Sequence, residues 1–348
     1  MKPRILLLIA FLTLTSCKRE QKISASGQAV ISSLVQYSEK DSILHIQSGK
    51  FTYDLKENQL PLKKIILLNA SMAGYISALG AENRVAGVSS PEYIYDQKIH
   101  DLLRGGKIQP VGNDQKYDVE KIISLKPDAV FTNYIPSFDN TYQLLKNNGI
   151  QVIFLDEYRE QEPLEKTAYL KLFGKLLGKS EEAEKTYREI EEHYNELKKL
   201  ALQAKEKPEV LANEMYGDVW YLPGGKTSVA RFISDANAEY ILKNNTEEKA
   251  VTMSFEEVFA KSAGVQYWIN AGNHSSKKEM LSKNPFYSKI SAFNKGKVYS
   301  ITGKERGQAN DFFESGIVRS DLVLKDYIKI FHPGLLPDEP LSYMKELQ

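Results

Sequence analysis

The chain has 348 residues and carries 46 basic and 45 acidic side chains, which gives a formal net charge of +1. Because nucleic-acid binding depends on clustered lysine and arginine that neutralise phosphates, this balance argues against a nucleic-acid partner. The length suits two domains, or one unit with two lobes.

The N-terminus carries the features of an export signal. Two basic side chains precede an apolar stretch, residues 5–14, which is too short to span a bilayer as a helix but fits a secretory signal. The stretch leads into Leu-Thr-Ser-Cys17, which is typical of a bacterial lipoprotein cleavage site where the cysteine is lipidated. Cys17 is also the single cysteine, so an internal disulfide is impossible. We expect residues 1–17 to be the signal peptide and residues 18–29 a tether; an ordinary signal peptide with an incidental cysteine is the alternative.

Strand and helix patterns alternate through the first half of the chain, which argues for a parallel sheet with helices on its faces. Short alternating stretches in residues 30–60 predict peripheral strands. We expect residues 30–160 to form an N-terminal α/β lobe. Its predicted strands are 63–68, 84–88, 128–132 and 151–155, and its predicted helices are 72–79, 119–125 and 140–148.

Residues 161–206 have almost no strand signal and predict a helical connector. Leucines at helical spacing lead to Gly178, and a second, richly charged helix is expected over residues 180–205 with a solvated face. A second α/β lobe follows over residues 207–340, with a tail at 341–348. Its expected strands are 209–215, 219–222, 265–270 and 297–301, and its expected helices are 228–234, 255–263 and 312–330. One long helix between the lobes should permit little hinge motion.

One short pattern occurs in both halves. Asp118 and Ser254 are good N-cap residues, and each is followed two positions later by a glutamate, Glu120 or Glu256, and then by apolar residues and a strand. The glutamates have a purely structural explanation, because acidic side chains in a first helical turn offset the helix dipole and Ser254 with Glu257 fits a capping box. The repeat nevertheless predicts two similar α/β lobes, each with a central, mostly parallel sheet. A long helical backbone joins them, and a ligand cleft lies between them.

Several segments resemble substrate-binding proteins of the helical-backbone class, which serve ATP-driven importers of ferric siderophores, haem and cobalamin. The resemblance covers nearly everything from residue 63 to residue 340. It is carried by residues 79–88 (LGAENRVAGV), 118–130 (DVEKIISLKPDAV), 144–153 and 323–333.

The resemblance implies a membrane-anchored lipoprotein on the periplasmic, extracytoplasmic side. We expect a monomer whose partners are an ABC permease with its ATPase, a small-molecule metal chelate and, through the lipid anchor, the membrane. No cofactor and no protein metal site are expected. In this family each lobe offers a surface glutamate to an arginine cluster on the permease, and Glu120 and Glu256 match those two positions. Glu257 adds a neighbouring carboxylate, and whether it shares or replaces the role of Glu256 stays open at this point.

Ligands of two-lobed α/β proteins bind at the carboxyl ends of strands facing the cleft. Aromatic side chains there stack on flat or hydrophobic chelates, and arginine pairs with anionic groups. Arg306 is the best cationic candidate, with Trp220 and Tyr134 as aromatic platforms, although each aromatic could pack inside its own lobe. The candidate ligand residues are Ser71, Met72, Ser90, Tyr93, Asn133, Tyr134, Tyr216, Trp220, Asn273, Arg306 and Asn310.

Three other functions remain open at this point. An enzyme is one, but the Gly-Lys-Thr at 225–227 lacks the first glycine of a phosphate loop, since position 220 is tryptophan. The five histidines are scattered, and His274 is expected to be a solvated loop residue. A binder of a bare metal ion and a scaffold without transport function are the other two. Ferric siderophore is preferred over haem and cobalamin only because it is the commonest ligand in the family.

Overall fold

The computed structural model of the protein describes residues 28–295 and 297–348. The expected signal peptide, the lipidation site at Cys17 and most of the tether lie outside the described residues. Within the part of the chain that is described, no helix is both long and apolar enough to cross a membrane.

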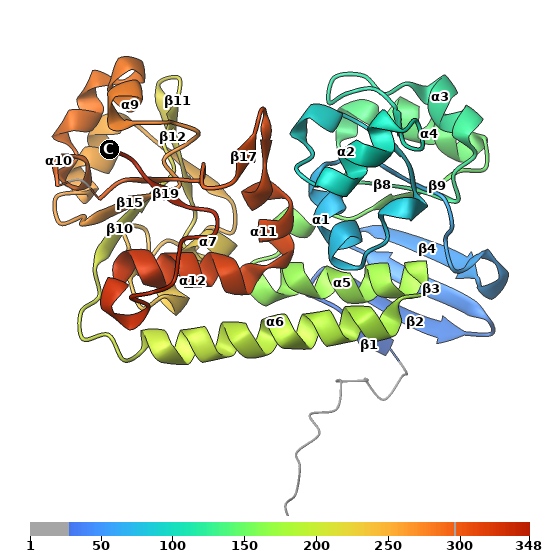
Figure 1. Cartoon of the computed structure of the whole chain (residues 1–348), viewed down its shortest axis with the longest axis horizontal. Helices are drawn as coiled ribbons and strands as arrows, with labels where there is room; N and C mark the ends of the chain where they lie inside the picture. The colour runs from blue at the N-terminus through green and yellow to red at the C-terminus, as the bar shows by residue number, and fades with distance from the viewer. Residues whose placement is uncertain (1–27, 296) are drawn as a thin grey trace, which may run out of the picture.

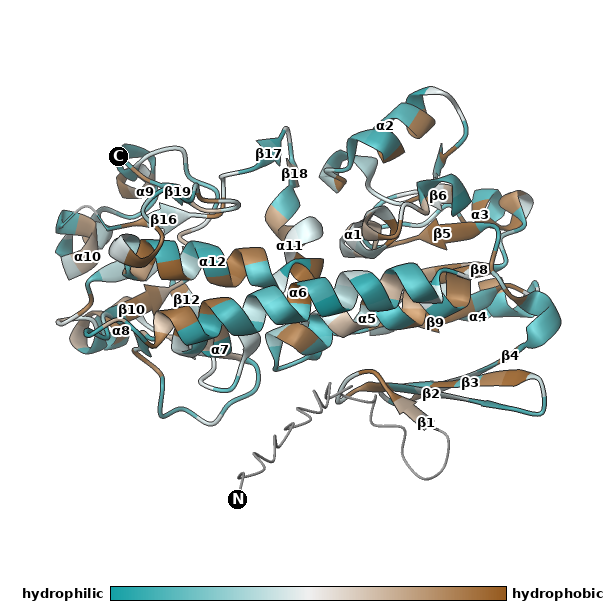
Figure 2. Ribbon diagram, turned by 60° about the horizontal axis from the view of Figure 1, so that its bottom comes forward, coloured by the Kyte–Doolittle hydropathy of each residue, from teal (hydrophilic) through white to brown (hydrophobic). Residues whose placement is uncertain are grey.

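A four-stranded antiparallel sheet opens the described chain, in the order β1 (Gln28–Val30), β2 (Val35–Lys40), β3 (Ile43–Ser48) and β4 (Phe51–Lys56). Figure 2 shows it as a separate layer beside the first lobe. Alternate residues of β3 and β4, including Leu44, Ile46, Tyr53 and Leu55, are buried, as expected for strands with one covered face. The Tyr53 hydroxyl accepts a hydrogen bond of 2.8 Å from the backbone N–H of Phe154, which ties this sheet to the lobe.

The N-terminal lobe contains a five-stranded, entirely parallel sheet in the order β7-β6-β5-β8-β9. Helices connect its strands, which confirms the predicted alternation (Figure 1). The elements in chain order are β5 (Ile65–Leu67), α1 (Ser71–Ala78), β6 (Val85–Val88), α2 (Gln97–Arg104), β7 (Gln109–Pro110), α3 (Val119–Leu125), β8 (Ala129–Thr132), α4 (Asp139–Asn147) and β9 (Gln151–Phe154).

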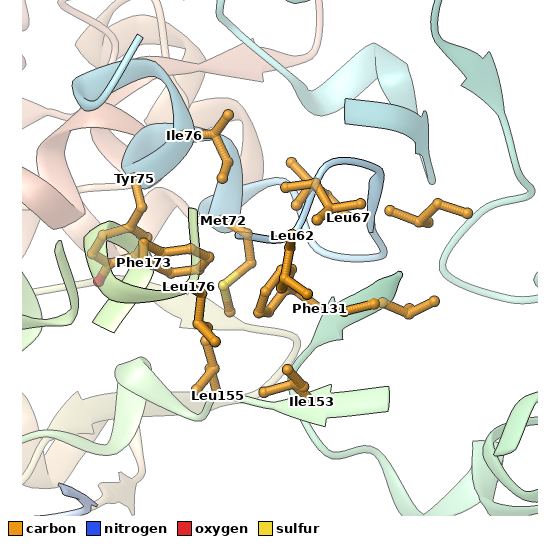
Figure 3. Packing of buried hydrophobic residues seen from close by; sticks show 14 of the residues in the cluster. Leu62, Leu67, Met72, Tyr75, Ile76, Phe131, Ile153, Leu155, Phe173 and Leu176 are labelled. Atoms are coloured by element: carbon orange, nitrogen blue, oxygen red, sulfur yellow. The ribbon is translucent and has the colours of Figure 1, made fainter. Parts of the chain in front are cut away.

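Two helices form the backbone that joins the lobes. They are α5 (Pro163–Leu177) and α6 (Ser180–Ala201), and Gly178 ends α5 in the left-handed conformation that glycine adopts easily. Phe173 of α5 packs with Leu67, Met72 and Phe131 in the core of the N-terminal lobe (Figure 3). Figure 1 shows α6 running beneath both lobes, and Figure 2 shows that its outer face is largely hydrophilic, as its charge pattern predicts.

The C-terminal lobe has a smaller parallel sheet, β13-β10-β15, beside a second sheet that is antiparallel, β11-β12-β14. The parallel strands are β10 (Glu209–Ala212), β13 (Glu239–Tyr240) and β15 (Tyr267–Ile269), and the antiparallel strands are β11 (Met215–Tyr216), β12 (Val219–Pro223) and β14 (Ala250–Met253). The helices of this part are α7 (Ser228–Asp235), α8 (Phe255–Lys261), α9 (Lys277–Lys283) and α10 (Ser291–Asn294).

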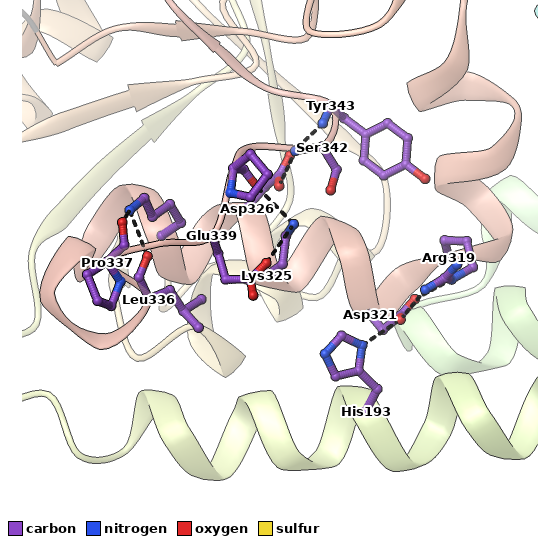
Figure 4. A network of polar contacts seen from close by, with 12 residues as sticks. His193, Arg319, Asp321, Lys325, Asp326, Leu336, Pro337, Glu339, Ser342 and Tyr343 are labelled. Carbon is purple, nitrogen blue, oxygen red and sulfur yellow. Dashed lines mark hydrogen bonds and ion pairs between the residues drawn. The ribbon is translucent and has the colours of Figure 1, made fainter.

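The last part of the chain differs from the expected single helix over residues 312–330. The 3₁₀-helix η7 (Asp311–Phe313) leads to α11 (Ser315–Val318), and the chain leaves helical geometry at Arg319 before α12 (Ser320–Phe331). The Arg319 guanidinium donates hydrogen bonds of 2.9 and 2.7 Å to Asp321 at the start of α12, and Asp321 also lies 2.8 Å from His193 of α6 (Figure 4). These contacts stabilise the break.

The segment expected as a tail, residues 341–348, is part of the C-terminal lobe. Its strand β19 (Lys345–Glu346) pairs with β16 (Tyr299–Ser300), and Tyr343, Met344 and Leu347 are buried. The carboxylate of Asp326 accepts hydrogen bonds of 2.7, 2.7 and 3.0 Å from the backbone N–H groups of residues 342–344 (Figure 4). Sequence patterning misses this because the short strand becomes stable only by pairing.

Candidate ligand and docking residues

Three of the expected ligand residues lie inside the N-terminal lobe. Met72 is fully buried in the core. The hydroxyl of Ser71 and the amide of Asn133 donate hydrogen bonds of 2.7 and 2.9 Å to the two carboxylate oxygens of Glu157, which is itself buried. Burial raises the pKa of Glu157, and these two donors oppose that rise. The three residues therefore stabilise the carboxyl end of the sheet rather than line an open surface.

Ser90 and Tyr93 lie three positions apart in sequence but differ in accessibility. Ser90 is buried, has a left-handed backbone (φ 44°) and accepts a hydrogen bond of 3.1 Å from the backbone N–H of Asp114. Tyr93 ends the 3₁₀-helix η3 (Pro91–Tyr93) and is 44% exposed. Of these two, only Tyr93 can contact a ligand without rearrangement.

Tyr134 contacts the N-terminal sheet. Its ring lies 5.0 Å from that of Phe51 of β4, and the Lys50 ammonium lies 4.3 Å from the Tyr134 ring centroid. Its hydroxyl donates to Asp139 at 3.1 Å. Lys50 and Phe51 therefore already pack against the Tyr134 ring.

The assignment of Trp220 as a ligand platform is wrong. Trp220 is fully buried, 5.3 Å from Trp268 and 5.8 Å from Tyr287 between ring centroids, and its indole N–H donates to the carbonyl of Ala212 at 3.2 Å. Its place on β12 points it into the core of the C-terminal lobe. When the neighbours of a strand residue are also apolar, the sequence does not alternate, so it cannot tell whether the aromatic side chain points into the core or outward.

Tyr216 takes the exposed position instead. It lies in the β11–β12 hairpin, is 83% exposed and lines a cavity of about 750 Å³ in the C-terminal lobe. The residues that line this cavity include 214–218, which follow β10, and His274, which follows β15. The cavity therefore lies at the carboxyl end of the parallel sheet. Phe286, 53% exposed, and Lys283 also line it. Asn273 is exposed next to His274.

His274 is buried, contrary to the expectation of a solvated loop residue. Its Nε2 lies 2.6 Å from a carboxylate oxygen of Glu214, and its Nδ1 lies 3.8 Å from Glu279. The hydrogen bond to Glu214 raises the pKa of His274. Across residues 28–295 and 297–348, however, no group of three or more His, Cys, Asp or Glu side chains is placed to hold a metal ion.

Arg306 and Asn310 belong to a short hairpin formed by β17 (Glu305–Arg306) and β18 (Ala309–Asn310). The Asn310 side chain is buried and hydrogen-bonded within the lobe, to the carbonyl of Ile301 and the N–H of Phe312, both at 2.9 Å. The Arg306 guanidinium reaches the N-terminal lobe, where it donates to the carbonyl of Tyr95 and to the side chain of Gln97. As the structure stands, Arg306 is an interlobe contact.

Glu314 is a second interlobe residue, and sequence reasoning missed it. Its carboxylate accepts hydrogen bonds of 2.6 and 2.9 Å from the backbone N–H groups of Tyr95 and Asp96. Burial raises the pKa of Glu314 to about 8. Sequence gives no signal for it, because its partners are backbone groups more than 200 positions away.

The two expected docking glutamates have equivalent surroundings. Glu120 and Glu256 each lie in the first turn of a helix, α3 or α8, and both are exposed. Asp118 caps α3 by accepting from the N–H of Lys121, and Ser254 caps α8 by accepting from the N–H of Glu257. Neither Glu120 nor Glu256 has a hydrogen bond or ion pair to another described residue.

Glu257 differs from Glu256, since its carboxylate accepts a hydrogen bond of 2.8 Å from the N–H of Ser254 and completes a capping box. The same bond lowers the pKa of Glu257. This division of tasks leaves Glu256 as the free carboxylate of the pair.

The Gly-Lys-Thr segment before α7 is not arranged to receive a phosphate. The backbone N–H groups of Gly224 and Lys226 donate to the carbonyls of Lys249 and Glu247, both at 3.1 Å, and the N–H of Gly225 donates to the side chain of Asn245 at 3.2 Å. A phosphate loop requires such N–H groups to be free for the ligand.

Comparison with known proteins agrees with this geometry. A family model described as periplasmic binding protein matches residues 65–305. An uncharacterized lipoprotein of Methanocaldococcus jannaschii is 23% identical over 320 residues, which cover 89% of this chain and 74% of that protein.

Two solved structures share the fold. A periplasmic heme binding protein from Pseudomonas aeruginosa has a TM-score of 0.62 and 17% identity, with 82% of this chain and 98% of that chain covered. Helicobacter pylori Ceue, solved with Ni(II) bound, has a TM-score of 0.63 and 18% identity, covering 85% and 91%. With the family match extending over both lobes, the chain belongs to the periplasmic binding protein family.

Proposed function

We propose that the protein is the substrate-binding lipoprotein of an ABC importer. It captures a metal chelate, with ferric siderophore preferred over haem or cobalamin, and delivers it to a membrane permease. Family membership supports the transport role, and the related solved structures include proteins described as binding iron, heme or Ni(II). An enzyme or a scaffold has less support, because the matching family model is that of periplasmic binding proteins.

The observation that carries the proposal is the pair of free carboxylates, one on each lobe. Arginine binds a carboxylate through two directed hydrogen bonds, so one such contact per lobe would fix the orientation of the whole protein on a permease. The free Glu256 also lines the cavity that contains Tyr216. Docking and ligand transfer would therefore take place close together on the C-terminal lobe.

Uptake measurements test the docking role. A Glu120→Arg/Glu256→Arg double variant should lose uptake. Ligand affinity should be unchanged in Glu120→Arg alone, because Glu120 lies on the surface, has no described partner and does not line the cavity. A Glu181→Arg/Glu196→Arg variant makes the same charge change on exposed positions of α6 and serves as the control. Normal uptake by the first variant would refute the docking assignment.

Ligand class is tested by intrinsic fluorescence of the soluble protein without residues 1–17. Trp220 and Trp268 are the two tryptophans of the chain, and both lie within 6 Å of Tyr287, which lines the cavity, measured between ring centroids. Saturable quenching by ferric catecholate, hydroxamate or citrate chelates, haem or cobalamin would identify the ligand. No response across this panel would argue against a metal chelate.

A further inference from the structure

One segment of the N-terminal lobe is held from the C-terminal lobe by the side chains of Glu314 and Arg306. The segment is residues 94–97, which lead into α2. Glu314 accepts from its N–H groups, at Tyr95 and Asp96, while Arg306 donates to its carbonyls, at Tyr95 and, at 3.5 Å, Ile94. The Arg306 guanidinium also lies 5.4 Å from the centroid of the Tyr95 ring. The Glu314 carboxyl oxygens thus meet N–H donors and the Arg306 guanidinium meets carbonyl oxygens. The hydrogen bonds of the charged guanidinium are stronger than neutral ones.

The two lobes also pack closely at the base of this contact. A Cβ atom at Gly74 of α1 would lie 2.3 Å from the carbonyl oxygen of Glu314, so the backbones of α1 and the start of α11 approach as only glycine allows. Figure 1 shows α11 and the β17–β18 hairpin on the side of the C-terminal lobe that faces α1 and α2.

The segment that carries Glu314 contacts both lobes, and Val318 of α11 belongs to the hydrophobic core of the N-terminal lobe. Ser315 shares a hydrogen bond of 2.9 Å with the hydroxyl of the buried Tyr343, and Lys304 lies 3.5 Å from the carboxylate of Asp311. At the other end of α11, Thr167 of α5 donates to the carbonyl of Val318 at 2.8 Å. Separation of the lobes would therefore break the contacts of Arg306 and Glu314 with residues 94–97 together with the packing of α11 against the N-terminal lobe.

We propose that Arg306 and Glu314 form an interlobe clamp that resists separation of the lobes and regulates access to the cleft expected between them. Arg306 can pair with an anionic group of a ligand only after it releases residues 94–97. The ligand part of this inference rests on the proposed function; the clamp itself does not. Because apparent affinity scales with the fraction of molecules in the binding-competent arrangement, the clamp lowers the apparent affinity for the ligand.

Interlobe distances measured by pulsed electron paramagnetic resonance test the clamp. Cys17 is the single native cysteine, so a full chain with Cys17→Ser accepts spin labels only at introduced positions. Lys107→Cys just after α2 and Lys278→Cys on α9 place one label on each lobe at exposed sites. In this background, Glu314→Gln and, independently, Gly74→Ala should shift the distance distribution to longer and broader values.

Glu305→Gln is the matched control, since it makes the same substitution at an exposed neighbour of Arg306 and should leave the distribution unchanged. Distributions of Glu314→Gln and Gly74→Ala that coincide with the parent would overturn the clamp. The measurement uses no chelate, so failure to bind any member of the ligand panel would count against the proposed function and leave this result intact.

Discussion

Gly74 and Glu314 meet across the lobe interface with no space for a side chain between them. A Cβ atom at Gly74 would lie 2.3 Å from the Glu314 carbonyl oxygen and 2.8 Å from its carbonyl carbon. Both are backbone atoms, so the overlap cannot be relieved by rotating a side chain. A single missing methyl group therefore permits the contact between α1 and α11.

Gly74→Ala should lower the free energy of unfolding by about 1–3 kcal/mol, the usual cost of overpacking, despite the better helix propensity of alanine. Urea unfolding at constant pH measures this. Gly334→Ala is the control, because nothing lies within 4 Å of a Cβ atom at that position. Equal stability of the two variants would show that the lobe interface relaxes without cost.

The buried Glu314 predicts a pH dependence. Its pKa in the folded protein is raised to about 8 from the ordinary value of 4.5, mainly by burial, with further contributions from Asp96 at the start of α2 and Asp311 in η7, while the backbone donors at Tyr95 and Asp96 oppose the rise. Arg306, which contacts the same residues 94–97, and Lys304, which lies 3.5 Å from Asp311, carry the positive charges on these elements. Since the folded state holds the proton more tightly, this stabilising contribution is present below pH 4.5 and is lost as pH rises through about 8.

Comparison of the parent with Glu314→Gln at pH 6 and pH 9 measures this effect. Relative to the variant, the parent should lose on the order of a few kcal/mol of stability between the two values, since one unit of pKa shift corresponds to about 1.4 kcal/mol. Glu305→Gln should follow the parent. A constant difference between parent and Glu314→Gln over this range would contradict the raised pKa.

Tyr216 and Trp220 should separate binding from stability. Tyr216→Ala removes an exposed ring, so the free energy of unfolding should change by less than about 0.5 kcal/mol, while chelate affinity falls. Trp220→Ala empties part of the core and should cost about 3–5 kcal/mol. Chemical unfolding and ligand titration of both variants provide the test. Parental affinity of the Tyr216→Ala protein would show that the cavity is not part of the ligand site.

Glu256 and Glu257 should respond differently to the same substitution. Glu256→Gln removes the free carboxylate and should reduce uptake, because a neutral amide cannot form the ion pair with a permease arginine. Glu257→Gln keeps a side chain that can complete a capping box, so uptake should be close to that of the parent. Transport assays with both single variants decide between them, and a larger defect in Glu257→Gln would reverse the assignment.

Asp326 should hold the C-terminal segment in place. Asp326→Asn weakens hydrogen bonds to three consecutive backbone N–H groups, so the amides of residues 342–344 should exchange faster with solvent and stability should fall by about 1–3 kcal/mol. Asp338→Asn, at an exposed position of the preceding loop, is the control. Unchanged amide exchange in Asp326→Asn would mean that strand pairing with β16 is enough to hold residues 342–344 in place.

Local pattern was enough for most of the architecture. The expected strands at 128–132 and 151–155 and the helices at 119–125 and 140–148 agree with β8, β9, α3 and α4 to within about one residue at each end. The caps at Asp118 and Ser254 were also predicted correctly, because a capping hydrogen bond joins residues only three positions apart. The break at Arg319 was not, since a charge pair with Asp321 and contacts from α5 and α6 stabilise it.

The sequence by itself determined the two-lobed α/β fold, the helical backbone and the equivalent positions of Glu120 and Glu256, since each depends on residues close together in the chain. Only the tertiary structure decided that Trp220 is buried, that His274 pairs with Glu214 and that Arg306 and Glu314 hold residues 94–97. Burial and partner choice depend on which distant segments meet, and two residues more than 200 positions apart carry no mark of their contact until the chain has folded.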